Sequence, residues 1–196
     1  MLSLKDSLAV LKKTKALLEG HFVLSSGLHS PQYVQCAKLL SYPKKSEKFC
    51  KSLSTKIKKK FKKIDIILSP AMGGIVIGYI VGNLLNKETI FCERVNGKFI
   101  LRRGFSIKKN SKVLIVEDVI TTGKSSLECA RLVKKYKSKV VGYACLINRS
   151  SKPSLKIKDK NIVSQIKLEI PTYKKNVLPI ELKKIPITKP GSRYLK

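Results

Sequence analysis

The residues with the clearest chemical meaning lie between positions 113 and 126, VLIVEDVITTGKSS. The stretch opens as a continuous apolar run, which is typical of a strand buried on both faces. Glu117-Asp118 is the only adjacent acidic pair in the chain, and it follows at the carboxyl end of that strand, where parallel sheets bind ligands. Residues 121–125 are small, hydroxylated and glycine-bearing, and they open a predicted helix, whose first backbone amides favour a phosphate.

Two carboxylates beside a phosphate cradle suit a sugar phosphate. The acids can accept hydrogen bonds from ribose hydroxyls while the loop holds the 5′-phosphate. A turn after Asp118 and a helix cap at Thr121 or Ser125 would explain one or two of these residues. They would not explain the whole string, so we expect a sugar-phosphate site here.

The surrounding elements alternate between strands and helices. Val/Ile/Leu-rich strands separated by helices predict an α/β fold with a mostly parallel sheet flanked by helices. A hairpin at Asn96-Gly97 is predicted from its turn residues. We expect strands over 64–68, 89–92, 99–101, 112–116, 139–147 and 162–168, and helices over 74–85 and 125–136.

The N-terminal part predicts a helix followed by an arm. Ser3 is the expected N-cap, with Asp6 three residues on, and the apolar period of the helix extends to Leu17-Leu18. Residues 22–35 mix short apolar pieces with Ser, Gly and Pro, which indicates an irregular hairpin. A second helix spans 49–61. We expect one domain over 1–196: a helix and arm to about residue 40, an α/β core over about 41–150, and a C-terminal extension over about 151–196.

The uncharged segment 66–86 imitates a membrane helix with glycines at every fourth residue. Ser69-Pro70 and Gly73-Gly74 interrupt it and leave about 11 residues for a helix, too few to cross a hydrocarbon core of roughly 30 Å. The segment therefore predicts a strand, a turn and a helix, with no contact with a membrane.

Composition limits the remaining classes. The 196 residues include 42 Lys and Arg against 12 Asp and Glu, a net charge of +30 that suggests an anionic partner. Only six of these cations are arginine, and the lysines are spread along the chain, so we expect a solvated basic surface and no nucleic-acid partner. The five cysteines are odd in number and lack CxxC spacing. With no secretory signal, they indicate buried thiols in the cytoplasm.

The segment VLIVEDVITTGKS resembles the signature of type I phosphoribosyltransferases. Further segments are similar to those of the orotate branch: GHFVLSSGLHSPQY, SPAMGGIVIGY, ERVNGKFILRRGF, CLINRS and the ending KPGSR. The resemblance implies the type I phosphoribosyltransferase fold with a small N-terminal arm or hood. It also implies transfer of the 5-phosphoribosyl group from phosphoribosyl pyrophosphate to orotate, giving orotidine 5′-phosphate and pyrophosphate in pyrimidine biosynthesis.

The resemblance also assigns residues. It implies that ribose 5-phosphate is bound by Glu117, Asp118, Val119, Ile120, Thr121, Thr122, Gly123, Lys124 and Ser125. It implies a pyrophosphate loop of Ser69, Pro70, Ala71, Met72, Gly73 and Gly74, and an orotate site of Thr121 and Arg149. Arg94 and Lys98 match a mobile catalytic loop whose lysine reaches the neighbouring subunit's site.

The resemblance implies Mg²⁺ as cofactor, with no protein ligand assigned, and a homodimer with shared active sites. Two other functions stay open. A purine phosphoribosyltransferase would share the signature but would not need Arg149 for a carboxylate. A regulator that senses phosphoribosyl pyrophosphate would need a DNA-binding segment, and the first 20 residues offer only one helix. For the two histidines, His21 and His29, we expect packing or hydrogen bonding in the arm.

Overall fold

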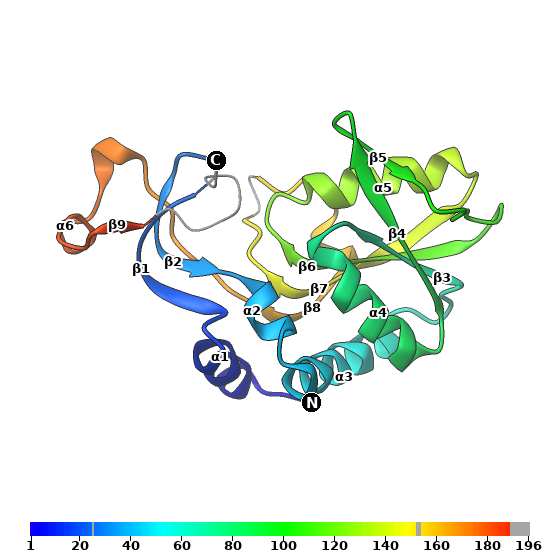
Figure 1. Cartoon of the computed structure of the whole chain (residues 1–196), viewed down its shortest axis with the longest axis horizontal. Helices are drawn as coiled ribbons and strands as arrows, with labels where there is room; N and C mark the ends of the chain where they lie inside the picture. Colours follow the sequence, from blue (N-terminus) through cyan, green and yellow to red (C-terminus); the bar gives the residue numbers. More distant parts are fainter. Residues whose placement is uncertain (25, 152–153, 189–196) are drawn as a thin grey trace.

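The computed structural model describes residues 1–24, 26–151 and 154–188, and its core is a six-stranded sheet (Figure 1). All neighbouring strands are parallel except β5, which is antiparallel to β4. The predicted mostly parallel α/β sheet is confirmed. In spatial order the strands are β5 (Lys98–Leu101), β4 (Glu88–Val95), β3 (Ile66–Pro70), β6 (Lys112–Ile120), β7 (Lys139–Asn148) and β8 (Ile162–Lys167).

Helices cover both faces of this sheet. Alternate residues of β6 divide between two apolar clusters: Leu114 and Val116 pack on the side of the N-terminal helices, whereas Val113 and Ile115 pack on the opposite side. This period of two explains why the strands are apolar throughout. The first face is covered by α2 (Cys36–Leu40), α3 (Pro43–Lys60) and α4 (Gly73–Leu85), and the second by α5 (Lys124–Lys135).

The first helix, α1 (Leu4–Lys13), begins as predicted. The Ser3 hydroxyl accepts a hydrogen bond from the Asp6 amide at 3.0 Å. The prediction that the helical period continues to residues 17 and 18 is wrong. Lys15 adopts a left-handed conformation with φ 55°, which a helix interior does not accommodate, and the following apolar pair instead begins β1 (Leu17–Val23).

A second, three-stranded sheet forms a hood at one end of the molecule (Figure 1). The predicted hairpin is present, with β1 antiparallel to β2 (His29–Val34). The third strand, β9 (Ile187–Thr188), pairs in parallel with the other edge of β1. The sequence did not predict β9, α6 (Ile180–Lys183) or the 3₁₀ turns at 159–161 and 175–177. The chain's two ends thus build the hood together, and the KPGSR ending lies outside the described residues.

Several strands extend beyond their predicted ends, among them β3, β4 and β6. β3 continues through Pro70, where Ser69-Pro70 was expected to end it. It pairs with β6 only as far as Leu68 and with β4 to its end, so Pro70 lies where one side of the strand needs no ladder bond. β6 continues through the acidic pair because β7 runs beside it to Asn148.

The uncharged segment 66–86 divides into β3 and the 13-residue α4, as predicted. Within the described ranges no helix is both long and apolar enough to cross a membrane. All five cysteines are free and buried, which confirms that they are core thiols.

Candidate active site

The sheet brings most of the predicted site residues to one edge. Because β3, β4, β6 and β7 are parallel, their carboxyl ends meet there. The acidic pair lies in β6, and residues 69–74 run from the last two residues of β3 into the first two of α4. Arg94 lies near the end of β4, and Arg149 follows β7. Arg149 is tied to β6 by a hydrogen bond from its backbone amide to the Ile120 carbonyl at 2.8 Å.

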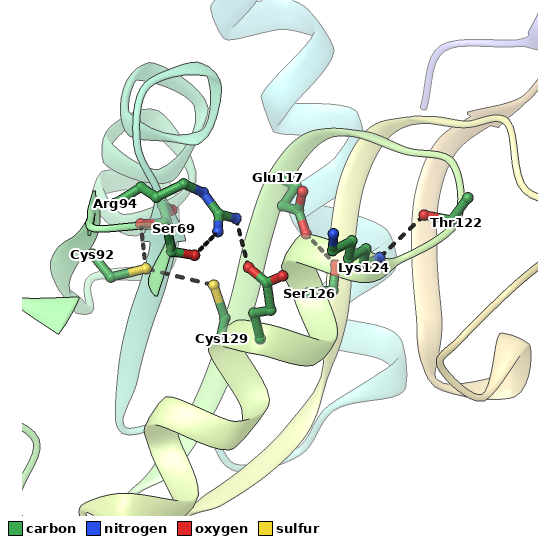
Figure 2. A network of polar contacts seen from close by, with 10 residues as sticks. Ser69, Cys92, Arg94, Glu117, Thr122, Lys124, Ser126 and Cys129 are labelled. Atoms are coloured by element: carbon green, nitrogen blue, oxygen red, sulfur yellow. Dashed lines mark hydrogen bonds and ion pairs between the residues drawn. The ribbon is translucent and has the colours of Figure 1, made fainter. Parts of the chain in front are cut away.

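The two acids of β6 are held differently. Glu117 is buried, and its Oε1 accepts a hydrogen bond from the Ser126 hydroxyl (Figure 2). Burial raises the pKa of Glu117 to about 7 against the lowering effect of that hydrogen bond, and the nearby charge of Asp118 adds to the rise. Asp118 is half-buried, its Oδ1 accepts from the Val119 amide at 2.8 Å, and burial raises its pKa too.

The segment 121–125 leads from the end of β6 into α5 at the same edge of the sheet. Gly123 is the N-cap, with φ 67° and no side-chain cap, so neither Thr121 nor Ser125 caps the helix. The C-terminal segment supports this turn from behind: the Lys156 amide donates to the Thr122 carbonyl at 2.8 Å, and a Cβ on Gly123 would lie 2.9 Å from Ile157. The Thr122 hydroxyl accepts a hydrogen bond from the Lys124 amide at 3.4 Å (Figure 2). Gly123 itself offers no side-chain cap, and the first turn of α5 holds no acid, so this helix start suits a phosphate.

The loop after β3 approaches β6 so closely that it requires glycine. A Cβ on Gly73 would lie 2.8 Å from Asp118 Oδ2, and one on Gly74 would lie 3.1 Å from the Val116 carbonyl. The Ala71–Met72 peptide bond is cis. α4 begins here without a side-chain cap and without an acid in its first turn. The starts of α4 and α5, whose N-cap residues make no side-chain cap, therefore lie beside the acidic pair: α4 approaches Asp118 at Gly73, and α5 contacts Glu117 through Ser126.

Arg94 lies on a regular hairpin rather than on an extended loop. Asn96 and Gly97, with φ 47° and 78°, form the two-residue turn between β4 and β5, and the hairpin protrudes from the body of the molecule (Figure 1). The predicted hairpin at Asn96-Gly97 is confirmed. Lys98 starts the second strand opposite Val95 and is exposed. Arg94 and Lys98 thus lie on the same hairpin. Their catalytic role stays a prediction.

The charged side chain of Arg149 is half-buried between the core and the hood. Its Nε is buried and has no hydrogen-bond partner among the described residues. Burial lowers its pKa, and the hydroxyl of Tyr33 and the thiol of Cys36 are close enough to act against that shift. A planar guanidinium with an unused buried N–H suits a carboxylate ligand.

Sequence reasoning missed three residues around the site. Ser126 bonds Glu117, Glu128 pairs with Arg94, and Tyr33 of β2 lies near Arg149. Glu128 carried a usable signal, since it is one of only 12 acids and lies one helical turn after Lys124. The position of Tyr33 depends on the docking of the hood, which no local pattern encodes.

The two histidines form hydrogen bonds in the arm, as predicted. His21 Nε2 lies 2.6 Å from His29 Nδ1, and His21 Nδ1 lies 3.2 Å from the Ile185 carbonyl. Both rings are buried in the hood, and burial lowers the pKa of His29. They join β1, β2 and the C-terminal segment.

Comparison with known proteins decides the family. A family model described as phosphoribosyl transferase domain matches residues 41–183. The orotate phosphoribosyltransferase of Parvibaculum lavamentivorans is 44% identical over 185 residues, which cover 94% of each chain. The chain belongs to the orotate phosphoribosyltransferase family. The resemblance of the motifs to this family is thereby confirmed.

Solved structures show the same fold. The orotate phosphoribosyltransferase of Aeropyrum pernix matches with a TM-score of 0.69 at 23% identity, covering 82% of this chain and 93% of that one. The adenine phosphoribosyltransferase of Thermoanaerobacter pseudethanolicus matches with a TM-score of 0.59 at 18% identity, covering 70% and 88%. The expected type I phosphoribosyltransferase fold is confirmed.

Proposed function

We propose that this enzyme transfers the 5-phosphoribosyl group from phosphoribosyl pyrophosphate to orotate, giving orotidine 5′-phosphate and pyrophosphate for pyrimidine biosynthesis. The observation that carries the proposal is Arg149, a half-buried cation whose buried Nε is unused, at the edge that also holds the acidic pair and two helix starts. The orotate phosphoribosyltransferase at 44% identity supports it.

In this proposal the β6 edge binds ribose 5-phosphate. The carboxylates of Glu117 and Asp118 accept hydrogen bonds from the ribose hydroxyls, and the start of α5 binds the 5′-phosphate through backbone amides. Thr121 also contacts orotate, whose carboxylate Arg149 binds through its guanidinium fork. The residues assigned to ribose 5-phosphate are Glu117, Asp118, Val119, Ile120, Thr121, Thr122, Gly123, Lys124 and Ser125, and those at 121–125 bind the 5′-phosphate.

The loop of Ser69, Pro70, Ala71, Met72, Gly73 and Gly74 binds pyrophosphate. As this group leaves, positive charge develops on the ribose C1 and negative charge on the pyrophosphate. Catalysis therefore rests on positioning and electrostatic stabilisation, to which Arg94 and Lys98 contribute cations, and it needs no nucleophilic side chain.

The donor atoms at this edge fit Mg²⁺ held mainly by substrate. The described residues contain no group of three or more His, Cys, Asp and Glu side chains that could hold a metal by themselves. Mg²⁺ needs only one or two carboxylates when substrate phosphates and water complete its shell. Asp118, whose Oδ2 faces the loop at Gly73, and Glu117 supply them. When bound, the ion would neutralise charge on pyrophosphate.

We further propose a homodimer with shared active sites. Met72, Val76 and Tyr79 are 81%, 46% and 72% exposed, and their spacing of four and three residues places them on one side of α4 and its N-cap. An exposed apolar stripe beside the site suits a second copy of the chain. A cytoplasmic location is supported by the five buried free thiols.

Orotate is favoured over purine bases by the same residue. Adenine and hypoxanthine carry no carboxylate, so they would leave the buried charge of Arg149 without a partner. The structure offers no support for a DNA-binding regulator, since the first 20 residues form α1 and the start of β1. The test is pyrophosphate release from phosphoribosyl pyrophosphate with orotate, adenine or hypoxanthine. Of the three bases, we expect only orotate to support pyrophosphate release. Release with adenine or hypoxanthine and not with orotate would refute the proposal.

A further inference from the structure

Glu128 is an acidic side chain at the rim of the proposed pyrophosphate site. It is one of 12 acids in a chain of net charge +30, and its side chain is 21% exposed. Its charge is close enough to Glu117 to help raise the pKa of that residue. A carboxylate here repels a pyrophosphate, so its presence requires a compensating role.

The contact that Glu128 makes is with Arg94. Glu128 Oε2 lies 2.5 Å from Arg94 Nη2, while Arg94 Nη1 donates to the Gly97 carbonyl at 2.5 Å. The guanidinium also lies over the ring of Phe99, 4.1 Å from its centroid. These contacts orient the guanidinium and occupy only part of its five N–H donors, which leaves donors for an anion.

The place of this ion pair in the fold is informative. Pro70, the last residue of β3, pairs with Cys92 in the β3–β4 register. Arg94 therefore stands two residues beyond the end of that pairing, next to the part of the proposed pyrophosphate loop that follows Pro70. Glu128 lies one turn into α5. Figure 2 shows the Arg94 side chain reaching from β4, above Ser69, toward α5, where its guanidinium pairs with Glu128. The pair therefore bridges two elements across the edge where pyrophosphate would leave.

We propose that Glu128 is a positioning residue that holds the Arg94 guanidinium over the pyrophosphate subsite and acts on the reaction only through Arg94. A half-exposed arginine has many rotamers, so fixing its side chain in one of them costs conformational entropy. If the ion pair orders Arg94 before substrate binds, this entropy is not lost on the way to the transition state. Arg94 in turn neutralises the carboxylate, so the pair adds no net negative charge to the subsite. This inference rests on the proposed function.

The test is a double-mutant cycle on the full-length enzyme, with kcat and KM for phosphoribosyl pyrophosphate measured by pyrophosphate release with orotate. We expect Glu128→Gln to lower kcat by about tenfold, since misplacement of a positioned group costs on this scale. We expect Arg94→Ala to lower kcat further. The double variant should then be within about twofold of Arg94→Ala, because the two residues act as one unit.

Glu47→Gln is the matched control. Glu47 forms an exposed ion pair with Lys51 on α3, at 2.6 Å, so this variant loses the same charge and a comparable pair outside the site. Its kcat should equal that of the wild-type enzyme. All variants should unfold within a few degrees of wild type, because exposed ion pairs contribute at most about 1 kcal/mol.

The possible failures differ from one another. If the wild-type enzyme releases no pyrophosphate with orotate, the proposed function falls and the role of Glu128 falls with it. If the wild-type enzyme is active but the losses from Glu128→Gln and Arg94→Ala multiply in the double variant, Glu128 acts independently of Arg94. That second result would overturn only the positioning role.

Discussion

Glu117 shows how one buried residue links the site to the stability of the fold. Its pKa rises from 4.5 to about 7 because burial disfavours the carboxylate. The folded state therefore binds a proton more tightly than the unfolded state does. At pH values below 4.5 both states are protonated and burial costs nothing through this group. The cost grows as the pH rises from about 4.5 to 7 and is complete above pH 7.

The first prediction follows from that sign. Replacing Glu117 with Gln removes the titration while keeping a similar volume. The unfolding free energy of Glu117→Gln should rise relative to wild type between pH 5 and pH 8, by on the order of 3 kcal/mol. Urea unfolding at both pH values measures the difference. A difference that does not change with pH would show that Glu117 is ionised in the folded protein at pH 5.

Arg149 is expected to determine the choice of base. Arg149→Ala should lower kcat/KM for orotate by about 10²-fold, since loss of a charge-assisted bidentate contact costs a few kcal/mol. Binding of phosphoribosyl pyrophosphate, measured by calorimetry without orotate, should change by less than about threefold. Arg149→Lys should recover only part of the activity, because an ammonium group cannot reproduce the fork.

Normal use of orotate by both Arg149 variants would contradict the base assignment.

The meeting of the acidic pair, the glycine loops and Arg149 at one edge of the sheet was predictable from sequence because each belongs to a contiguous motif, whereas their roles stay predictions. The contacts of Tyr33 with Arg149 and of Glu128 with Arg94 were not predictable, since each partner lies on another element, more than 30 residues away in the sequence. Long-range packing, not local pattern, decides such contacts.

At the scale of elements, the β4–β5 hairpin carries Arg94 and Lys98 on a frame with two anchors. Arg94 joins it to α5, and Arg103 binds Glu93 through two contacts of 3.0 Å. The turn needs left-handed backbone at Asn96 and Gly97. Such a hairpin presents its cations in one arrangement, which suits the positioning of charge before the reaction.

Gly97 in the hairpin turn and Gly104, which follows β5, offer a matched pair of substitutions. Gly97 and Gly104 have φ 78° and 74°, and a Cβ at either would meet no atom within 4 Å. Alanine at either position should therefore cost about 1 kcal/mol of stability through backbone strain alone. Only Gly97→Ala should also lower kcat, by about threefold, because the Gly97 carbonyl accepts from Arg94.

Thermal unfolding and steady-state kinetics of both glycine variants test this. An equal loss of kcat in the two would mean that general destabilisation, not hairpin geometry, affects the rate.

The sequence predicted this hairpin from Asn96-Gly97 because turn chemistry is local. It placed several strand ends too early, at residues 92 and 116 for β4 and β6. Their true ends depend on how far a neighbouring strand pairs, which only the assembled sheet shows.

At the scale of the whole molecule, the two ends of the chain meet in the hood. β9 covers an edge of β1, an arrangement that leaves fewer unpaired backbone groups at that edge. The extension over 151–196 was predicted with one strand, at 162–168. β9 was missed because a two-residue strand leaves no periodic signal. Its residues 155–157 also support the Gly123 turn, so the C-terminal segment contacts both the hood and the core.

The last prediction concerns assembly. If Met72, Val76 and Tyr79 bury against a second copy, Tyr79→Lys should weaken the homodimer by on the order of 30-fold, since truncating a central aromatic anchor costs about 2 kcal/mol or more. A net charge of +30 on each chain opposes association, so raising the salt concentration should strengthen the dimer. Sedimentation equilibrium at two salt concentrations measures both effects.

Leu4→Lys is the control, because it adds the same charge at an exposed apolar residue of α1, and this variant should associate like wild type. Equal weakening by both substitutions would show that charge alone is responsible, and a wild-type monomer at high salt would exclude the α4 interface.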